Sequence, residues 1–295
     1  MDRAIKSLAH EGKVSVVAVD TTEMIEYIRK LNDLTPTTTA VLGRVATVAG
    51  MMGLTELKDN EDSITVQING RGPVGSIIAV IKREEGKSII KAYVENPNVE
   101  LPLNDNGKIA VGEAVGTDGF LNVIRENEVT GKAYNGLVPL VSGEIAEDFA
   151  EYFAKSKQTP TVLALGVLVD KNGVKRSGGY MISLMPDATD VEIEKIEKAI
   201  SEAKSVSQML DEDMSLEDIV RTVTGDKNAL FLLNDPSIQF KCDCSKERFA
   251  EGLSAINKDE LKKIIEEDGQ ATTKCHFCKK EYNFSKKELE KLLEK

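Results

Sequence analysis

The first 186 residues carry several short patterns of hydrophobic and polar positions that are typical of strands. Ile64, Val66 and Ile68 alternate with polar residues, as in a strand with one buried face. The run Val14–Val19 is rich in β-branched residues and predicts another strand. Turn signals at Glu84-Glu85-Gly86 and at Asn172-Gly173 each separate two apolar runs, and both predict β-hairpins. The paired runs are Val74–Ile81 with Ser88–Val94, and Thr161–Val169 with Val174–Leu184.

Two segments of the same region show helical spacing instead. One begins at Thr35-Pro36 and continues to Met52, and proline is favoured in the first turn of a helix. The other follows Ser142, with apolar side chains at Ile145, Phe149, Tyr152 and Phe153. Strands joined by hairpins, with few helices between them, predict an α+β domain with a mostly antiparallel sheet over residues 1–186.

The segment Gly70–Gly75 matches the glycine pattern G-x-G-x-x-G of dinucleotide-binding loops. In those loops the glycines open a helix, whose N-terminus faces the pyrophosphate. Here the run Ser76–Ile81 follows, and it predicts a strand. We therefore interpret the match as a glycine-rich turn, without a nucleotide site.

Residues 187–241 differ in charge from the region before them. They contain 13 acidic and 6 basic residues. Thr189 with Glu192, and Ser215 with Asp218, are start signals for two short helices, the second of which ends near Gly225. Isolated helices shorter than roughly 12–15 residues are marginal in water, so we expect an acidic helical linker that is stable only while packed.

Composition limits the classes of function. The chain has 295 residues, which favours two domains, and its net charge is −11. This charge argues against binding to nucleic acid or to an anionic membrane surface, both of which require a basic face. The apolar stretch before Val19 contains His10, Glu11 and Lys13 and does not resemble a signal peptide. We expect a cytoplasmic protein.

Residues 242–295 predict a small C-terminal zinc-binding domain. A segment of this length buries little core, so a metal or another cross-link is expected to stabilise it. Leu261, Ile264 and Ile265 predict one helix, and a leucine cluster near residue 290 predicts a terminal one. This segment has 12 basic and 12 acidic residues. Three of its aromatic residues are therefore expected to pack in the core and not to stack on bases. They are Phe277, Tyr282 and Phe284.

The four cysteines of the chain all lie in this segment, at Cys242, Cys244, Cys275 and Cys278. Their spacing is C-x-C, 30 residues, and C-x-x-C. Four thiolates make a closed tetrahedral zinc site, and a cluster confined to one segment favours a reducing compartment. Each pair can also close a short disulfide, so the spacing is compatible both with a permanent zinc ribbon and with a redox-active site. His276 is expected outside the ligand set, because four sulfurs already fill it.

Longer motifs around these cysteines resemble one known family. The carrying segments are Phe240–Phe249, with both cysteines of C-x-C, and Glu267–Ala271 leading to Cys275–Cys278. Further matching motifs lie along the rest of the chain, at residues 35–37, 42–44, 67–75, 142–148, 178–180 and 184–186. The sequence is similar to the redox-regulated 33 kDa heat-shock chaperones of bacteria over essentially its full length.

The resemblance implies an ATP-independent holdase and not an enzyme. The reduced family member binds one Zn²⁺ through the four cysteines and is inactive. The resemblance further implies that oxidation forms the disulfides Cys242–Cys244 and Cys275–Cys278 and releases zinc. The linker and the C-terminal domain then lose structure, unfolding client proteins bind to apolar surface, and homodimers form.

Two other functions remain open on the residues alone. One is a constitutive structural zinc-ribbon protein with a binding role, and the other is a thiol-disulfide oxidoreductase that uses Cys275 and Cys278. A ribbon that binds nucleic acid would need a basic surface, and neither half of the chain is basic. In thiol-disulfide oxidoreductases the C-x-x-C motif typically lies beside a βαβ unit. Here a second cysteine pair accompanies the motif instead.

Overall fold

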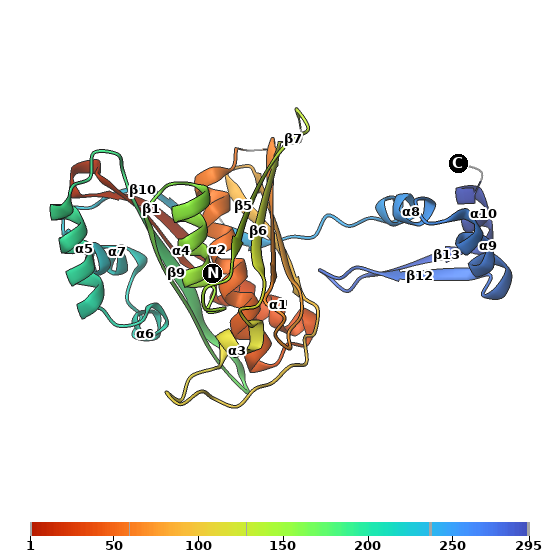
Figure 1. Ribbon diagram of the computed structural model, residues 1–295, viewed down its shortest axis with the longest axis horizontal. Coiled ribbons are helices and arrows are strands. Elements are labelled where there is room, and N and C mark those ends of the chain that lie inside the picture. The colour runs from red at the N-terminus through yellow and green to blue at the C-terminus, as the bar shows by residue number, and fades with distance from the viewer. Residues whose placement is uncertain (1, 59, 128, 236–237, 294–295) are drawn as a thin grey trace. The chain divides into compact units, whose positions relative to one another are not determined.

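The computed structural model of the protein describes residues 2–58, 60–127, 129–235 and 238–293. It divides into two compact units, Met1–Phe240 and Lys241–Lys295 (Figure 1). Buried hydrophobic clusters lie within each unit, and the two units are therefore described in turn.

The first unit contains a five-stranded antiparallel sheet with the strand order β10-β1-β2-β9-β8. The hairpin β8–β9 turns between Asp170 and Gly173, as the Asn172-Gly173 signal predicts. Positive φ angles at His10, Glu11 and Gly12 form the tight turn η1 (His10–Gly12) between β1 and β2. The strands are β1 (Arg3–Ala9), β2 (Val14–Asp20), β8 (Thr161–Asp170), β9 (Gly173–Leu184) and β10 (Leu230–Asp235).

A six-stranded sheet forms the other side of this unit, in the order β11-β5-β4-β3-β6-β7. All of its pairings are antiparallel except the short parallel pairing of β11 with β5. The hairpin at Glu84–Lys87 is present as predicted. The strands are β3 (Asp62–Asn69), β4 (Ile77–Glu84), β5 (Lys87–Val94), β6 (Phe120–Asn127), β7 (Lys132–Pro139) and β11 (Ile238–Phe240).

The helix α2 (Pro36–Glu56) lies between the two sheets and contacts both (Figure 1). Its N-cap is Thr35, whose hydroxyl accepts a hydrogen bond from the backbone N–H of Thr38. Nearly every residue from Thr37 to Leu54 is buried, so α2 is the centre of the main hydrophobic cluster. Three further helices border this core, α1 (Thr22–Asn32), α3 (Val111–Val115) and α4 (Ala146–Ser156).

Three helices cover the opposite face of the five-stranded sheet, namely α5 (Asp190–Glu202), α6 (Val206–Asp211) and α7 (Leu216–Thr224) (Figure 1). They form a second hydrophobic cluster with the sheet, in which Ile196, Met209 and Ile219 meet side chains such as Val16 and Tyr180. The helices of the acidic segment therefore pack on a sheet within the first unit. The predicted division into a domain over residues 1–186, a linker over 187–241 and a C-terminal domain over 242–295 stays a prediction.

The structure confirms the predicted α+β class with mostly antiparallel sheets, and it corrects several element predictions. The strand expected from Val74 begins only at Ile77, because residues 70–76 form a tight loop whose glycines pack on Val115 and Gly116. A strand follows this loop, which agrees with the interpretation of Gly70–Gly75 as a turn. The acidic segment has three helices where two were predicted. The additional helix, α6, begins at Ser205 with its own capping box.

The second unit is a small assembly of three helices and one hairpin. Its buried hydrophobic cluster is small and consists of Leu261, Ile265, Tyr282, Phe284 and Leu289. The predicted helix near Leu261 and the terminal helix are both present. The elements are α8 (Lys246–Ser254), α9 (Lys258–Glu267), β12 (Gln270–Lys274), β13 (Glu281–Ser285) and α10 (Lys286–Leu293).

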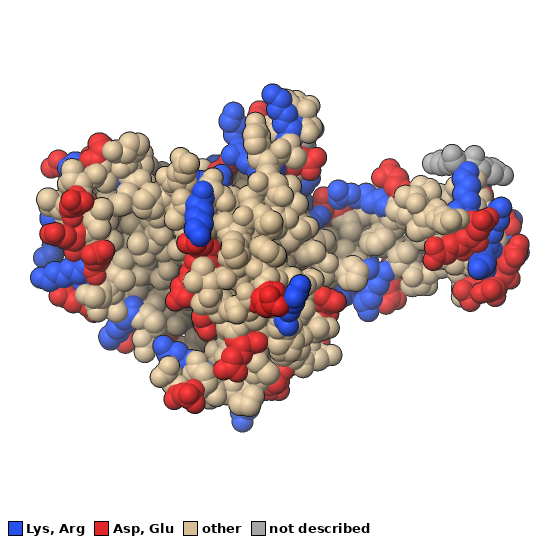
Figure 2. Space-filling view, viewed as in Figure 1, with Lys and Arg blue, Asp and Glu red and all other residues tan. Residues whose placement is uncertain are grey.

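The surface carries charges of both signs. On the face drawn in Figure 2, lysine and arginine side chains are interspersed with aspartate and glutamate, and the described residues form no continuous basic strip there. Among the described residues, every helix is too short or too polar to cross a bilayer.

Candidate metal centre

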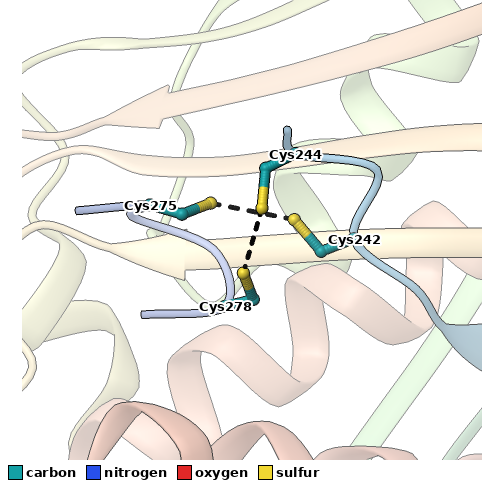
Figure 3. A group of neighbouring side chains, drawn as sticks. All are labelled: Cys242, Cys244, Cys275 and Cys278. Carbon is teal, nitrogen blue, oxygen red and sulfur yellow. Dashed lines mark hydrogen bonds between the residues drawn. The ribbon is translucent and has the colours of Figure 1, made fainter. Parts of the chain in front are cut away.

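The second unit brings together two cysteine pairs that lie in separate segments of its sequence. Cys242 and Cys244 lie in the irregular segment between β11 and α8, and Cys275 and Cys278 lie in the turn between β12 and β13. Figure 3 shows the four side chains pointing toward one another. All four Sγ atoms lie within 4.8 Å of one another.

The backbone of the hairpin turn shapes the C-x-x-C half of the cluster. Cys275 donates its N–H to the carbonyl of Lys280 at 2.9 Å, and its own carbonyl accepts the N–H of Lys279 at 2.9 Å. Lys279 has a φ of 59°, so the chain reverses sharply just after Cys278. This reversal places both sulfurs of the turn on the same side of the hairpin end.

The C-x-C half is held by side chains. Arg248 donates from Nη1 to the carboxylate of Asp243 at 2.7 Å, which ties the residue between the two cysteines to α8. The hydroxyl of Tyr282 on β13 donates to the carbonyl of Cys244 at 2.9 Å and lies 3.2 Å from its Sγ. Tyr282 therefore connects the C-x-C segment with the hairpin that carries the other pair.

The sulfur positions fit a tetrahedral metal ion. With Zn–S bonds of about 2.3 Å, sulfurs at the corners of a tetrahedron lie about 3.8 Å apart. The Sγ atoms of Cys242 and Cys275 are 3.7 Å apart, and those of Cys244 and Cys278 are 3.3 Å apart. All four cysteines are free thiols. The four cysteines could therefore hold one metal ion, and four sulfurs suit zinc or iron better than magnesium or calcium.

The surroundings shift the pKa values of Cys242, Cys244 and Cys278 in different directions. Burial raises the pKa of Cys242 and the pKa of Cys278 above the ordinary range of a thiol. Burial opposes ionisation of Cys244 as well. There, however, hydrogen bonds with the Tyr282 hydroxyl and with the neighbouring thiols outweigh it and lower the pKa. Cys244 therefore ionises more easily than an ordinary thiol, whereas Cys242 and Cys278 ionise less easily. A metal cation would favour the thiolate form of all four ligands.

His276 and the aromatic residues of the second unit differ in their burial. His276 is exposed, and it is not one of the described residues whose ligand atoms form the cluster. Tyr282 and Phe284 are buried in the small core of the unit, as predicted, whereas Phe277 is half-buried. Phe249 also packs here, with its ring 5.1 Å from that of Tyr282, although its sequence position alone does not indicate this role.

Comparison with known proteins gives one consistent family. The family model described as "Hsp33 protein" matches residues 2–285. A "33 kDa chaperonin" of Clostridioides difficile is 42% identical over 292 residues, which cover 99% of this chain and 98% of the relative. The 33 kDa chaperonin of Bacillus subtilis is 39% identical over 293 residues, with 99% and 98% coverage. The crystal structure of a 33 kDa chaperonin of Thermotoga maritima superposes with a TM-score of 0.87 at 33% identity, covering 99% of this chain and 97% of that one.

Proposed function

Because this chain belongs to the Hsp33 family of chaperones, we propose that it is a redox-regulated, ATP-independent holdase that binds unfolding proteins under oxidative stress. The family resemblance predicted from the cysteine motifs is confirmed by the matches over the whole chain. The observation that carries the redox part of the proposal is the cluster of four free thiols in the C-terminal unit. We propose the cytoplasm as its location.

In the reduced state, the proposed ligands of one Zn²⁺ are Cys242, Cys244, Cys275 and Cys278. When bound, the zinc ion supplies four bonds that join the C-x-C segment to the hairpin turn. The buried hydrophobic cluster of this unit is small, so the free energy of metal binding becomes most of its free energy of folding. The reduced protein is proposed to be inactive as a chaperone.

Oxidation is proposed to convert the cluster into the disulfides Cys242–Cys244 and Cys275–Cys278. Each disulfide forms when two cysteine thiolates pass two electrons to an oxidant such as hydrogen peroxide, which takes up two protons from the solvent and leaves as two molecules of water. A disulfide sulfur is no longer an anionic thiolate, so the metal loses its ligands. Each new bridge closes a loop of only a few residues and therefore restores little of the lost constraint.

Loss of order is proposed to spread from the C-terminal unit to the acidic linker. The strand β11 ends at Phe240, two residues before Cys242, so the linker and the metal site are adjacent in the chain. The helices α5–α7 cover an apolar face of the five-stranded sheet, with Ile5, Val16 and Ile182 beneath them. If these helices loosen, apolar surface becomes available to unfolding client proteins, and the oxidised protein is proposed to form homodimers.

Two alternative functions are those of a permanent zinc ribbon and of a thiol-disulfide oxidoreductase, and one experiment distinguishes both from the proposed holdase. The test measures three quantities on the full-length protein before and after mild peroxide treatment. They are zinc bound per chain, suppression of aggregation of a thermally unfolding reporter protein without ATP, and reduction of a protein disulfide. We expect release of one zinc ion per chain together with gain of aggregation suppression, and no disulfide reductase turnover.

Two neighbouring substitutions provide a matched control. Cys275→Ser removes one proposed ligand, and we expect it to lose zinc and to suppress aggregation without an oxidant. His276→Ala alters the adjacent, exposed residue and should keep both zinc and the oxidant requirement. Aggregation suppression that is equal before and after zinc release would support the permanent ribbon, and steady disulfide reduction would support the oxidoreductase.

A further inference from the structure

Tyr282 is the residue of the hairpin that reaches across to the C-x-C segment. Its ring is 8% exposed and belongs to the small buried core of the C-terminal unit. The ring of Phe249 lies 5.1 Å away at an interplanar angle of 35°, and the ammonium group of Lys280 lies 5.2 Å from the ring centroid. Packing on these sides fixes the ring and therefore fixes the direction of its hydroxyl.

The hydroxyl touches two acceptor atoms of Cys244, the carbonyl oxygen and the sulfur. Its oxygen is 2.9 Å from the carbonyl oxygen of Cys244 and 3.2 Å from Sγ. A tyrosine hydroxyl has one proton to donate and can also accept. With Cys244 as a thiol, the hydroxyl donates to the carbonyl and can accept the S–H proton. With Cys244 as a metal-bound thiolate, the same proton is within reach of the sulfur.

Two other contacts of this region are made by charged side chains. Arg248 binds Asp243 within the same segment. Lys246 binds Glu288 at 2.6 Å and joins α8 to α10, but both side chains are about 40% exposed. Exposed ion pairs contribute little to stability. Tyr282 makes its connection at a cysteine itself, from a buried ring.

We infer that Tyr282 is a positioning residue of the four-cysteine centre. Its single hydroxyl proton, shared between the carbonyl and the sulfur of Cys244, holds Cys244 against the β12–β13 hairpin and places a hydrogen-bond donor at the sulfur that would bind the metal. This inference rests on the proposed metal site and extends it to the shell of groups around the ligands. Hydrogen bonds to metal ligands orient them, and their loss typically weakens metal binding about 10- to 100-fold.

The test compares full-length wild-type protein with Tyr282→Phe, which keeps the ring and removes only the hydroxyl. The first readout is Zn²⁺ affinity of the reduced protein in competition with a chelator, for which we expect a loss of about tenfold or more. The second readout is the sulfur-to-metal charge-transfer band of the Co²⁺-substituted protein. The band should shift in energy, because the hydrogen bond withdraws charge from the Cys244 sulfur.

Two further variants separate positioning from simple destabilisation. Thr272→Val also removes one hydroxyl from the same hairpin, where Thr272 donates to Asn283 at 2.7 Å, and it should leave the band unchanged. Tyr282→Leu removes the ring as well, so its additional losses report packing. If Tyr282→Phe loads zinc within twofold of wild type and shows the same charge-transfer band, the inference is wrong.

The outcomes also distinguish this inference from the proposed function. A wild-type protein that binds no metal through its four cysteines would overturn the proposed metal site itself. A wild-type protein that binds one zinc ion, together with an indistinguishable Tyr282→Phe variant, would overturn only the role of Tyr282.

Discussion

At the scale of single residues, the chemistry of this protein is concentrated in four cysteines whose spacing is visible in the sequence. The pattern predicts a cluster, and the structure places all four Sγ atoms within 4.8 Å of one another. The role of Tyr282 has no such signal. It depends on the register of β13, which places the ring of Tyr282 inward and toward Cys244. A sequence motif does not reveal a contact between residues that are 38 positions apart.

The pairing of the cysteines on oxidation is the first prediction. Within the cluster, the sulfurs of Cys242 and Cys275 are 3.7 Å apart and those of Cys244 and Cys278 are 3.3 Å apart, so distance alone does not favour sequence neighbours. We nevertheless expect Cys242–Cys244 and Cys275–Cys278. Neighbours remain close after the unit loses order, whereas pairs 33 or 34 positions apart separate.

Peptide mapping after peroxide treatment measures this pairing. The mapping should be repeated in a mild denaturant, which separates the distant pairs further and should increase the yield of neighbour bridges. A predominance of Cys244–Cys278 or Cys242–Cys275 crosslinks in the native protein would show that the folded cluster, and not chain proximity, determines the pairing.

At the scale of elements, capping signals predict well where helices start, but they do not predict how the helices and sheets are arranged. Thr189, Ser215 and Thr35 each precede a helix as predicted, and Ser205 with Gln208 is a capping box that the sequence analysis overlooked. The position of α2 between two sheets could not be predicted in the same way. That helix is buried on all sides, so it lacks the polar face from which an orientation is usually inferred.

The attachment of α5 gives a prediction about pH. Glu192 accepts hydrogen bonds from the hydroxyl and N–H of Thr189 and an ion pair from Lys13 at 3.0 Å. These contacts lower the pKa of Glu192 to about 2, from the ordinary value of 4.5. The stabilisation is therefore present above about pH 4.5 and is lost as the pH falls toward 2. We expect amide exchange in α5, corrected for intrinsic rates, to increase over that interval.

Two substitutions on α5 check this attribution. Glu192→Gln should exchange faster at neutral pH and should lose most of the extra acid sensitivity of α5. Glu194→Gln, which changes an exposed acid on the same helix, should retain it. If amide exchange in α5 of Glu192→Gln increased with acid as much as in the wild type, other carboxylates would be responsible for the increase.

The stability of the acidic linker gives a prediction about the oxidant dose. Glu202 is exposed in the last turn of α5, where a negative charge is unfavourable because it lies near the free carbonyls. Glu202→Gln should stabilise α5 by about 0.3–1 kcal/mol. If linker instability controls activation, this variant should need more peroxide to reach half of its aggregation suppression, at unchanged zinc affinity.

The matched variant for this prediction is Glu194→Gln, which removes the same charge at another position of the helix. Glu194 lies four residues before Lys198, a spacing that favours the helix, so its replacement should destabilise α5 by about 0.2–0.5 kcal/mol. The two variants should therefore shift the half-maximal oxidant dose in opposite directions. If both variants had the same half-maximal oxidant dose, the stability of α5 would not control activation.

At the scale of the whole molecule, the sequence predicts the separate C-terminal unit, because all cysteines and a local composition change lie within it. The predicted linker is different. Its helices pack on the five-stranded sheet and form one compact unit with the N-terminal region. A charge pattern marks the segment but does not reveal which surface it covers, since Ile196 and Ile219 could pack equally well on any apolar face.

The last prediction concerns the order in which the molecule loses structure when zinc is removed. The C-terminal unit has a small buried core, so it should exchange its amide protons first. The helices α5–α7 should follow, because their anchoring strands β10 and β11 lie in the chain between them and the metal site. The helix α2 and the strands around it have a large core without a cysteine and should stay protected.

Hydrogen exchange read by mass spectrometry after chelation of zinc from the reduced protein measures this order. The same samples should be assayed for aggregation suppression, so that each step of exchange is compared with activity. Collapse of protection in α2 together with the C-terminal unit would show that the first unit depends on the metal. If activity instead appeared while α5–α7 stayed protected, the client surface would have to lie outside the face that these helices cover, and activation would follow from the C-terminal unit alone.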